Sequence, residues 1–228
     1  MVAVLVALVG AGALVDVPIA RAQILAARTP LPPDTATSSD RPMFEAEASS
    51  ASARGPLLIR NANTGGEALV RLYAADGKID PAGVAAFRDV AGEVDKPAPL
   101  KTRVIQLVVK AAYELGTRKV TLVSSFRAKD RRGKGGYHTT GDAVDFQLAG
   151  VGARKLASHL RRLPRVGVGI YTHPKTQYVH VDARDQSYHW LDASPPGRTW
   201  KEAPLHDRDR EARDAAWKPE DDLPTAGT

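Results

Sequence analysis

The chain has 228 residues, of which 43% are hydrophobic, so it is long enough for one ordinary domain with extensions. It contains no cysteine, which excludes disulfides, thiolate metal sites, a cysteine nucleophile and a lipidated N-terminal cysteine. Lysine and arginine outnumber aspartate and glutamate by 32 to 26, and this basic balance favours an anionic partner: nucleic acid, anionic lipid or cell-wall polymer.

The N-terminal segment has the pattern of an export signal. An apolar run of about fifteen residues is followed by Ala20-Arg21-Ala22, a small-residue pattern typical of a signal peptidase site. No lysine or arginine precedes the run, and the alternatives are a buried helix or a membrane anchor. We expect residues 1–22 to be a signal peptide and residues 23–55 to be a disordered linker rich in Pro, Ser and Ala. The protein would then be exported to the periplasm or cell envelope without a stable membrane anchor.

Regular structure is expected in residues 56–192. Short apolar runs at 57–59 and 68–73 flank Asn-Thr-Gly-Gly and predict a hairpin. Asp80 and Pro81 open a helix that Gly92 ends. Apolar residues at helical spacing predict a second helix over 100–115.

The second half of this region alternates strands and helices. We expect a strand at 119–126, a basic glycine-rich loop at 127–136, a strand at 141–148 and an amphipathic helix at 152–163. A hairpin over 166–170 and 178–184 follows. The Pro-rich and charged residues 193–228 are expected to be an extended or disordered tail.

Two polar side chains around the 141–148 strand are placed to bind a metal ion. Strand alternation puts Val144 and Phe146 on one face and Asp145 on the other, where a carboxylate needs a partner. His138 lies just upstream, and Gly141 permits the tight turn that folds its imidazole back beside Asp145.

A third candidate ligand comes from residues 178–184. Val179 and Val181 share the core face, so His180 and Asp182 project from the opposite face. Two nitrogens and one oxygen, from His138, Asp145 and His180, would hold Zn²⁺ at about 2.0 to 2.2 Å and leave a fourth tetrahedral position for water. Such an open position is typical of catalytic zinc, which acidifies water and polarises a peptide carbonyl.

These motifs resemble a known family. The stretch HTTGDAVD (138–145), preceded by SSFR (124–127) and followed by YVHVD (178–182), is similar to the zinc peptidases grouped as lysostaphin, D-Ala-D-Ala metallopeptidases and hedgehog. It is most similar to the murein endopeptidase K branch, over roughly residues 56–190. The resemblance implies an α+β fold with a mostly antiparallel sheet and flanking helices, as in hedgehog and D-Ala-D-Ala peptidases. It also implies one zinc ion on the three ligands, cleavage of peptides containing D-amino acids, and Arg127 as the residue that holds a substrate carboxylate or carbonyl.

The sequence leaves the general base open. In one common version of the family pattern an acid stands three residues before the last histidine, but here that position is Gln177, which cannot accept a proton. Asp182 is the first candidate, because it shares a strand face with His180, and His189 is the second. Alternatively, Asp182 accepts a hydrogen bond from a zinc-bound histidine and fixes its tautomer.

Simpler roles stay open for several residues. His138 and Asp145 could form a hydrogen-bonded pair without metal, and Arg127 could be a solvated member of the basic loop. Tyr137 and Tyr178 either line the cleft or cover the sheet. The residues expected to lie at the surface or to serve only in packing are His159, His173, His206 and Trp190.

We therefore expect a zinc-dependent murein peptidase of the cell wall, with endopeptidase action favoured over carboxypeptidase action and peptidoglycan as its partner. The low aromatic content of 6% and the lack of a stacking platform argue against nucleic-acid binding. The alternative, motivated by Gln177, is a non-catalytic metal-containing module that binds the cell wall. A structural zinc protein is a third hypothesis.

Overall fold

The computed structural model describes residues 54–92, 96, 98–128, 136–196, 198 and 203–225. The predicted signal peptide, nearly all of the predicted linker and most of the basic loop lie outside these residues. Within the described part of the chain, no helix combines the length and apolar character needed to cross a membrane.

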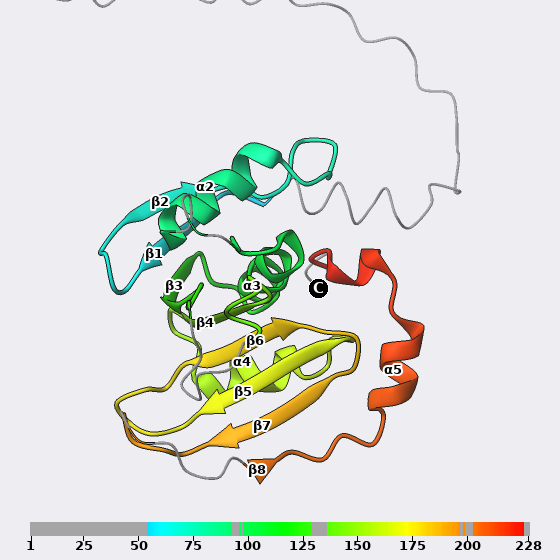
Figure 1. Ribbon diagram of the computed structural model, residues 1–228. Coiled ribbons are helices and arrows are strands. Elements are labelled where there is room, and N and C mark those ends of the chain that lie inside the picture. Colours follow the sequence, from blue (N-terminus) through cyan, green and yellow to red (C-terminus); the bar gives the residue numbers. More distant parts are fainter. Residues whose placement is uncertain are drawn as a thin grey trace, which may run out of the picture. The chain divides into compact units, whose positions relative to one another are not determined.

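One eight-stranded sheet lies at the centre of the described domain (Figure 1). Its strands are β1 (Leu57–Asn61), β2 (Glu67–Val70), β3 (Lys119–Ser124), β4 (Ala143–Leu148), β5 (Val166–Tyr171), β6 (Val179–Ala183), β7 (Tyr188–Asp192) and β8 (Ala203–Pro204). Their order across the sheet is β2-β1-β3-β4-β6-β5-β7-β8. The α+β class and both predicted hairpins, β1–β2 and β5–β6, are confirmed.

The sheet is mixed, which corrects the expected mostly antiparallel sheet. β1 runs parallel to β3, and β5 runs parallel to β7. The first parallel pair arises because the chain crosses over through two helices between β2 and β3. The second arises because β6 and β7 flank β5 on opposite sides. Side-chain periodicity identifies strands but not their neighbours, so the sequence pattern missed both pairs.

The three predicted helices are present and cover the apolar face of the sheet. They are α2 (Pro81–Ala91), α3 (Thr102–Glu114) and α4 (Ala153–Leu160). The Asp80 carboxylate accepts a hydrogen bond from the Ala82 N–H at the start of α2, and Gly92 ends this helix at φ 75°. α2 contacts β1 and β2, whereas α3 and α4 contact the central strands, so all three helices share one hydrophobic core.

The described residues 203–225 do not have the extended or disordered structure that composition predicted for 193–228. Residues 203–225 form β8, α5 (Arg210–Ala216) and the 3-10 helix η1 (Pro219–Asp222). The Asp214 carboxylate accepts hydrogen bonds from the backbone N–H groups of Arg165 and Ser187, each 2.6 Å long. The Trp217 ring lies beside the guanidinium groups of Arg103 and Arg165.

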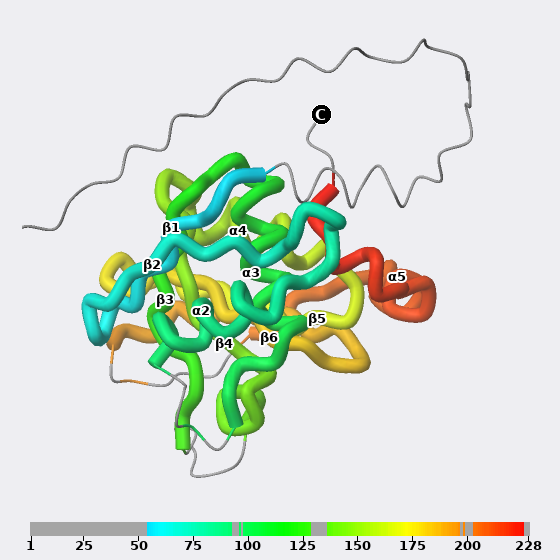
Figure 2. The backbone as a smooth tube through the Cα atoms, turned by 90° about the horizontal axis from the view of Figure 1, so that it is seen from above, coloured from blue at the N-terminus to red at the C-terminus, as the bar shows by residue number. Residues whose placement is uncertain are grey.

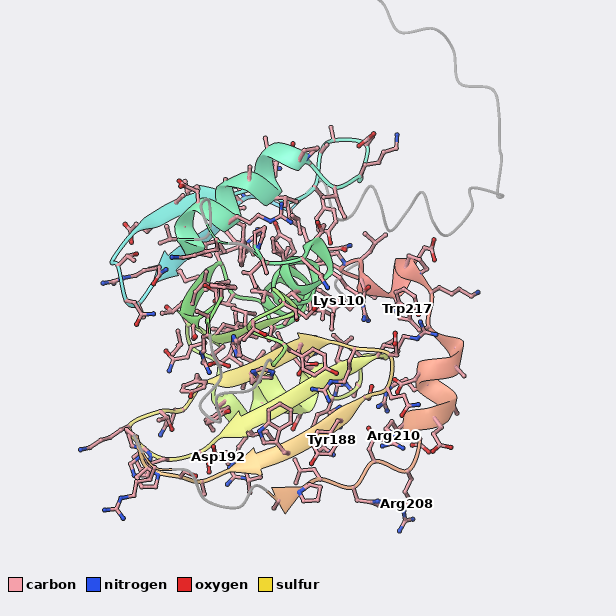
Figure 3. All side chains as sticks on the ribbon, viewed as in Figure 1. Lys110, Tyr188, Asp192, Arg208, Arg210 and Trp217 are labelled. Carbon is pink, nitrogen blue, oxygen red and sulfur yellow. The ribbon has the colours of Figure 1, made fainter. Side chains whose placement is uncertain are left out.

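Figure 2 shows this C-terminal segment, coloured orange to red, along one side of the domain, and Figure 3 labels Trp217 between α5 and the last described residues. η1 packs against α3. Two buried carboxylates tie the segment to the domain: Asp222 forms an ion pair with Arg103, and Asp214 accepts the backbone hydrogen bonds described above. For this reason composition alone predicted the wrong state.

Candidate metal centre

The register of two neighbouring strands brings the first two candidate ligands together. β4 and β6 are antiparallel, and Asp145 stands directly opposite His180. Val144, Phe146, Val179 and Val181 are fully buried on the helix-covered side, as strand alternation predicted. Asp145 and His180 therefore project from the other face of the sheet.

His138 reaches the same point from the turn that precedes β4. Gly141 ends the turn at φ 73°, and a side chain there would also collide with the Pro99 carbonyl. The Asp142 N–H donates to the Tyr137 carbonyl across the turn, 2.8 Å away. The predicted need for glycine is thus confirmed on both conformational and steric grounds.

Three ligand atoms converge on one point. His180 Nδ1 lies 2.9 Å from Asp145 Oδ1, His138 Nε2 lies 3.3 Å from the same oxygen, and the two nitrogens are 3.1 Å apart. Atoms held tetrahedrally about 2.0 to 2.2 Å from zinc are roughly 3.3 to 3.6 Å apart. The observed spacing fits a zinc ion after shifts of a few tenths of an ångström, and all three residues are buried.

Hydrogen bonds to neighbouring groups orient both imidazoles with a lone pair toward this point. His138 Nδ1 donates to the Ser125 carbonyl at 2.6 Å, which leaves Nε2 as an acceptor. His180 Nε2 donates to Asp182 Oδ2 at 2.9 Å, which leaves Nδ1 as an acceptor. When both rings are neutral, two nitrogen lone pairs and a carboxylate oxygen face one another, an arrangement suited to binding a cation, either a proton or a metal ion.

The surrounding charges favour such a cation. Burial lowers the pKa of His180, but its hydrogen bonds to Asp145 and Asp182 outweigh burial and raise the pKa to about 9. Burial raises the pKa of Asp145, but the hydrogen bonds from His138 and His180 outweigh it and hold that pKa far below its usual range. The cluster stabilises positive charge at its ligand atoms, whether a proton or a metal ion supplies it.

Arg127 lies beside the same carboxylate. Its Nη2 contacts Asp145 Oδ2, and its Nε donates to Ser124 Oγ at 2.7 Å. A shift of register between β3 and β4 places Ser124 opposite Asp145. About a third of the Arg127 side chain is exposed, so its guanidinium borders both the ligand cluster and solvent.

Comparison with known proteins agrees with this geometry. The family model described as peptidoglycan L,D-endopeptidase MepK matches residues 49–190, a stretch that includes all three candidate ligands. The chain belongs to this family.

Two curated relatives carry the same description. The probable peptidoglycan L,D-endopeptidase MepK of Haemophilus influenzae is 36% identical over 80 residues, which are 34% of this chain and 36% of the relative. The peptidoglycan L,D-endopeptidase MepK of Escherichia coli strain K12 is 36% identical over 87 residues, 33% of this chain and 46% of the relative. The chain therefore spans less than half the length of either relative. No solved structure was found to match the chain significantly.

The two candidates for the general base in this family member occupy different places. Asp182 is fully buried, and its two oxygens accept hydrogen bonds from His180 and from Arg184. His189 lies on the opposite face of the sheet, where its Nδ1 faces Arg161 and Asp207. The structure therefore brings Asp182 next to a ligand but does not bring His189 to the cluster. Gln177 is an exposed residue in the turn before β6.

Several residues that shape the site were missed by sequence reasoning. Gly169 on β5 lies opposite His180, and a Cβ there would lie 2.5 Å from Cε2 of Trp190. The absence of that Cβ lets the Trp190 ring lie 5.0 Å from the His180 ring, centre to centre. Gly167 makes similar room for Asp182 and Arg184. The signal was present as alternate glycines in a strand, which mark close approach.

The expectation that His159 lies at the surface is wrong. It is 8% exposed, and its Nε2 lies 2.9 Å from the Glu114 carboxylate, so it is a buried structural residue. His206 is exposed and His173 is partly exposed. Trp190 is buried, as expected of a packing residue.

Proposed function

We propose that the protein is a zinc metallopeptidase that hydrolyses an L,D-peptide bond in peptidoglycan and acts in the cell envelope. The observation that carries the proposal is the convergence of two imidazole nitrogens and one carboxylate oxygen on a single point. The descriptions of the relatives supply the substrate class and favour endopeptidase over carboxypeptidase action. The basic balance of the chain suits an anionic polymer.

The residues of the cluster have distinct roles in this proposal. Zn²⁺ on His138, Asp145 and His180 would supply a Lewis acid that polarises the scissile carbonyl. The Ser125 carbonyl keeps the His138 proton on Nδ1, away from the ligand side. Arg127 presents a planar set of N–H donors next to Asp145, and we assign it to a substrate carbonyl or carboxylate.

We assign Asp182 to the orientation of His180 and not to proton transfer with substrate. Both of its oxygens are engaged, and His180 stands between it and the ligand atoms. Asp182→Asn tests this role. If Asp182 orients His180, zinc affinity falls roughly 10- to 100-fold. Unchanged zinc affinity with lost turnover would instead support the general-base role.

The proposed hydrolysis is tested with purified protein, peptidoglycan sacculi and defined cross-linked muropeptides. Products are separated by chromatography and identified by mass spectrometry, with zinc, with a chelator, and with zinc restored. We expect a new amine and a new carboxylate at the L,D bond, lost with the chelator and in His138→Ala. An unchanged product profile in zinc-replete protein would remove the hydrolytic function. Retention on sacculi without cleavage would favour the binding module.

A further inference from the structure

Arg184, just beyond the end of β6, makes a two-point hydrogen bond to the carboxylate behind His180. Its Nε donates to Asp182 Oδ1 and its Nη2 to Asp182 Oδ2, both at 2.5 Å. The Arg184 side chain is 13% exposed, and Asp182 is fully buried. Such a parallel pair of bonds fixes the plane of the carboxylate, and hence the direction from which Asp182 accepts the His180 proton.

The strand next to Arg184 is built to admit this pair. Gly167 on β5 stands opposite Asp182, and a Cβ there would lie 2.5 Å from Cγ of Asp182. Gly167 does not have a positive φ, so backbone conformation does not require glycine here. Space for the ion pair is the reason for glycine at this position.

The Arg184 guanidinium also contacts the segment that carries His138. Arg184 Cζ lies 4.4 Å from the centre of the Tyr137 ring and 5.7 Å from that of Tyr188, labelled on β7 in Figure 3. Tyr137 immediately precedes His138. The turn is also tied to the end of β6, because the Ala183 N–H donates to the Asp142 carbonyl at 3.0 Å.

We propose that Arg184 is a positioning residue that holds both histidine ligands, His180 through Asp182 and His138 through the ring of Tyr137. The inference rests on the proposed metal site and deepens the proposed function. Arg184 touches neither the ligand atoms nor the point between them. Its effect is therefore on how well the two imidazoles are prearranged for the ion.

The test compares Arg184→Met, Arg184→Lys and Arg60→Met, the last an exposed arginine on β1 that serves as the control. Zinc affinity is measured by competition with a chromophoric chelator, and thermal unfolding of the metal-free protein checks folding. We expect zinc affinity to fall roughly 10- to 100-fold in Arg184→Met and to stay unchanged in Arg60→Met. Arg184→Lys should recover only part of it, because an ammonium cannot make both parallel hydrogen bonds.

A second set of measurements tests the contact with Tyr137 and distinguishes positioning of the ligands from substrate binding. Tyr137→Leu should weaken zinc binding by roughly two- to fivefold through loss of the cation–π contact. In hydrolysis of peptidoglycan, Arg184→Met should lower kcat and leave KM within about twofold of the wild-type value. KM is kept because, in this proposal, Arg184 makes no contact with the substrate. A raised KM with wild-type zinc affinity would overturn the proposal, since Arg184 would then bind substrate.

The two proposals fail in different ways. If Arg184→Met does not fold, Arg184→Lys decides: a folded lysine variant with wild-type zinc affinity overturns the positioning role. If wild type binds zinc but does not cleave peptidoglycan, the hydrolytic function fails, while the role of Arg184 is still judged from zinc affinity alone.

Discussion

Gly169→Ala is the most direct test of how β5 shapes the metal centre. The added Cβ would lie 2.5 Å from Cε2 and 2.8 Å from Nε1 of Trp190. Ordinary carbon contacts are about 3.5 to 4.0 Å, so the ring must move by roughly 1 Å. Trp190 is buried against the His180 ring, so this movement disturbs a ligand as well as the packing.

The expected loss of stability follows from adding a methyl group to a site that is already filled. We expect the free energy of unfolding to fall by about 1 to 3 kcal/mol, which is a drop in Tm of roughly 2 to 4 °C per kcal/mol for a domain of this size. Zinc affinity should fall by roughly tenfold or more, because the orientation of His180 changes. Thermal unfolding with chelator measures the first effect, and chelator competition measures the second.

Gly55→Ala is the matched control. Its Cβ would meet only Arg118 Nη1 at 3.7 Å, an ordinary contact. Its stability should stay within about 0.5 kcal/mol of wild type, as for most surface changes. If Gly169→Ala is as stable as Gly55→Ala and binds zinc like wild type, the steric reasoning about β5 is refuted.

Three further predictions concern charge and metal. Burial raises the pKa of Glu114, but the bonds from His159 and Lys110 outweigh it and lower the pKa from 4.5 to about 2. Because solvent screens the half-buried carboxylate, this contributes roughly 1 to 2 kcal/mol of stability, which is present above pH 4.5 and lost as pH falls toward 2, and Glu114→Gln should remove this dependence. Asp214→Ala leaves two backbone N–H groups and a serine hydroxyl without their acceptor and should cost about 3 to 5 kcal/mol. Zinc at 100 times its Kd should raise the free energy of unfolding by about 2.7 kcal/mol, an increase absent in His138→Ala.

Each of these has an outcome that contradicts it. A Glu114→Gln protein with the wild-type slope between pH 4.5 and 2 would show that another group causes the acid sensitivity. Wild-type stability of Asp214→Ala would mean that the C-terminal segment does not contribute to the fold in solution. Equal zinc stabilisation of wild type and His138→Ala would place the ion elsewhere.

Local patterns predicted the elements of the domain because those patterns have local causes. Asp80, Pro81 and Gly92 bound α2 through capping and backbone conformation, and both act within one turn. Strand alternation likewise predicted that Asp145 and His180 leave the apolar face. The C-terminal segment was predicted wrongly, because the residues that it contacts lie far away in sequence and composition does not indicate such contacts.

The sequence by itself identified the three candidate ligands, since residue types, spacing and strand period restrict which side chains can share a polar face. Only the tertiary structure decided how these side chains meet. The β4–β6 register sets Asp145 opposite His180, and the β5–β7 register sets His189 beside Val168 on the far face. The positions of Asp182 and Arg184 also depend on strand pairing, because Gly167 on β5 stands opposite Asp182 and leaves room for both side chains. Register and strand order are properties of pairing between distant segments, and no single segment contains them.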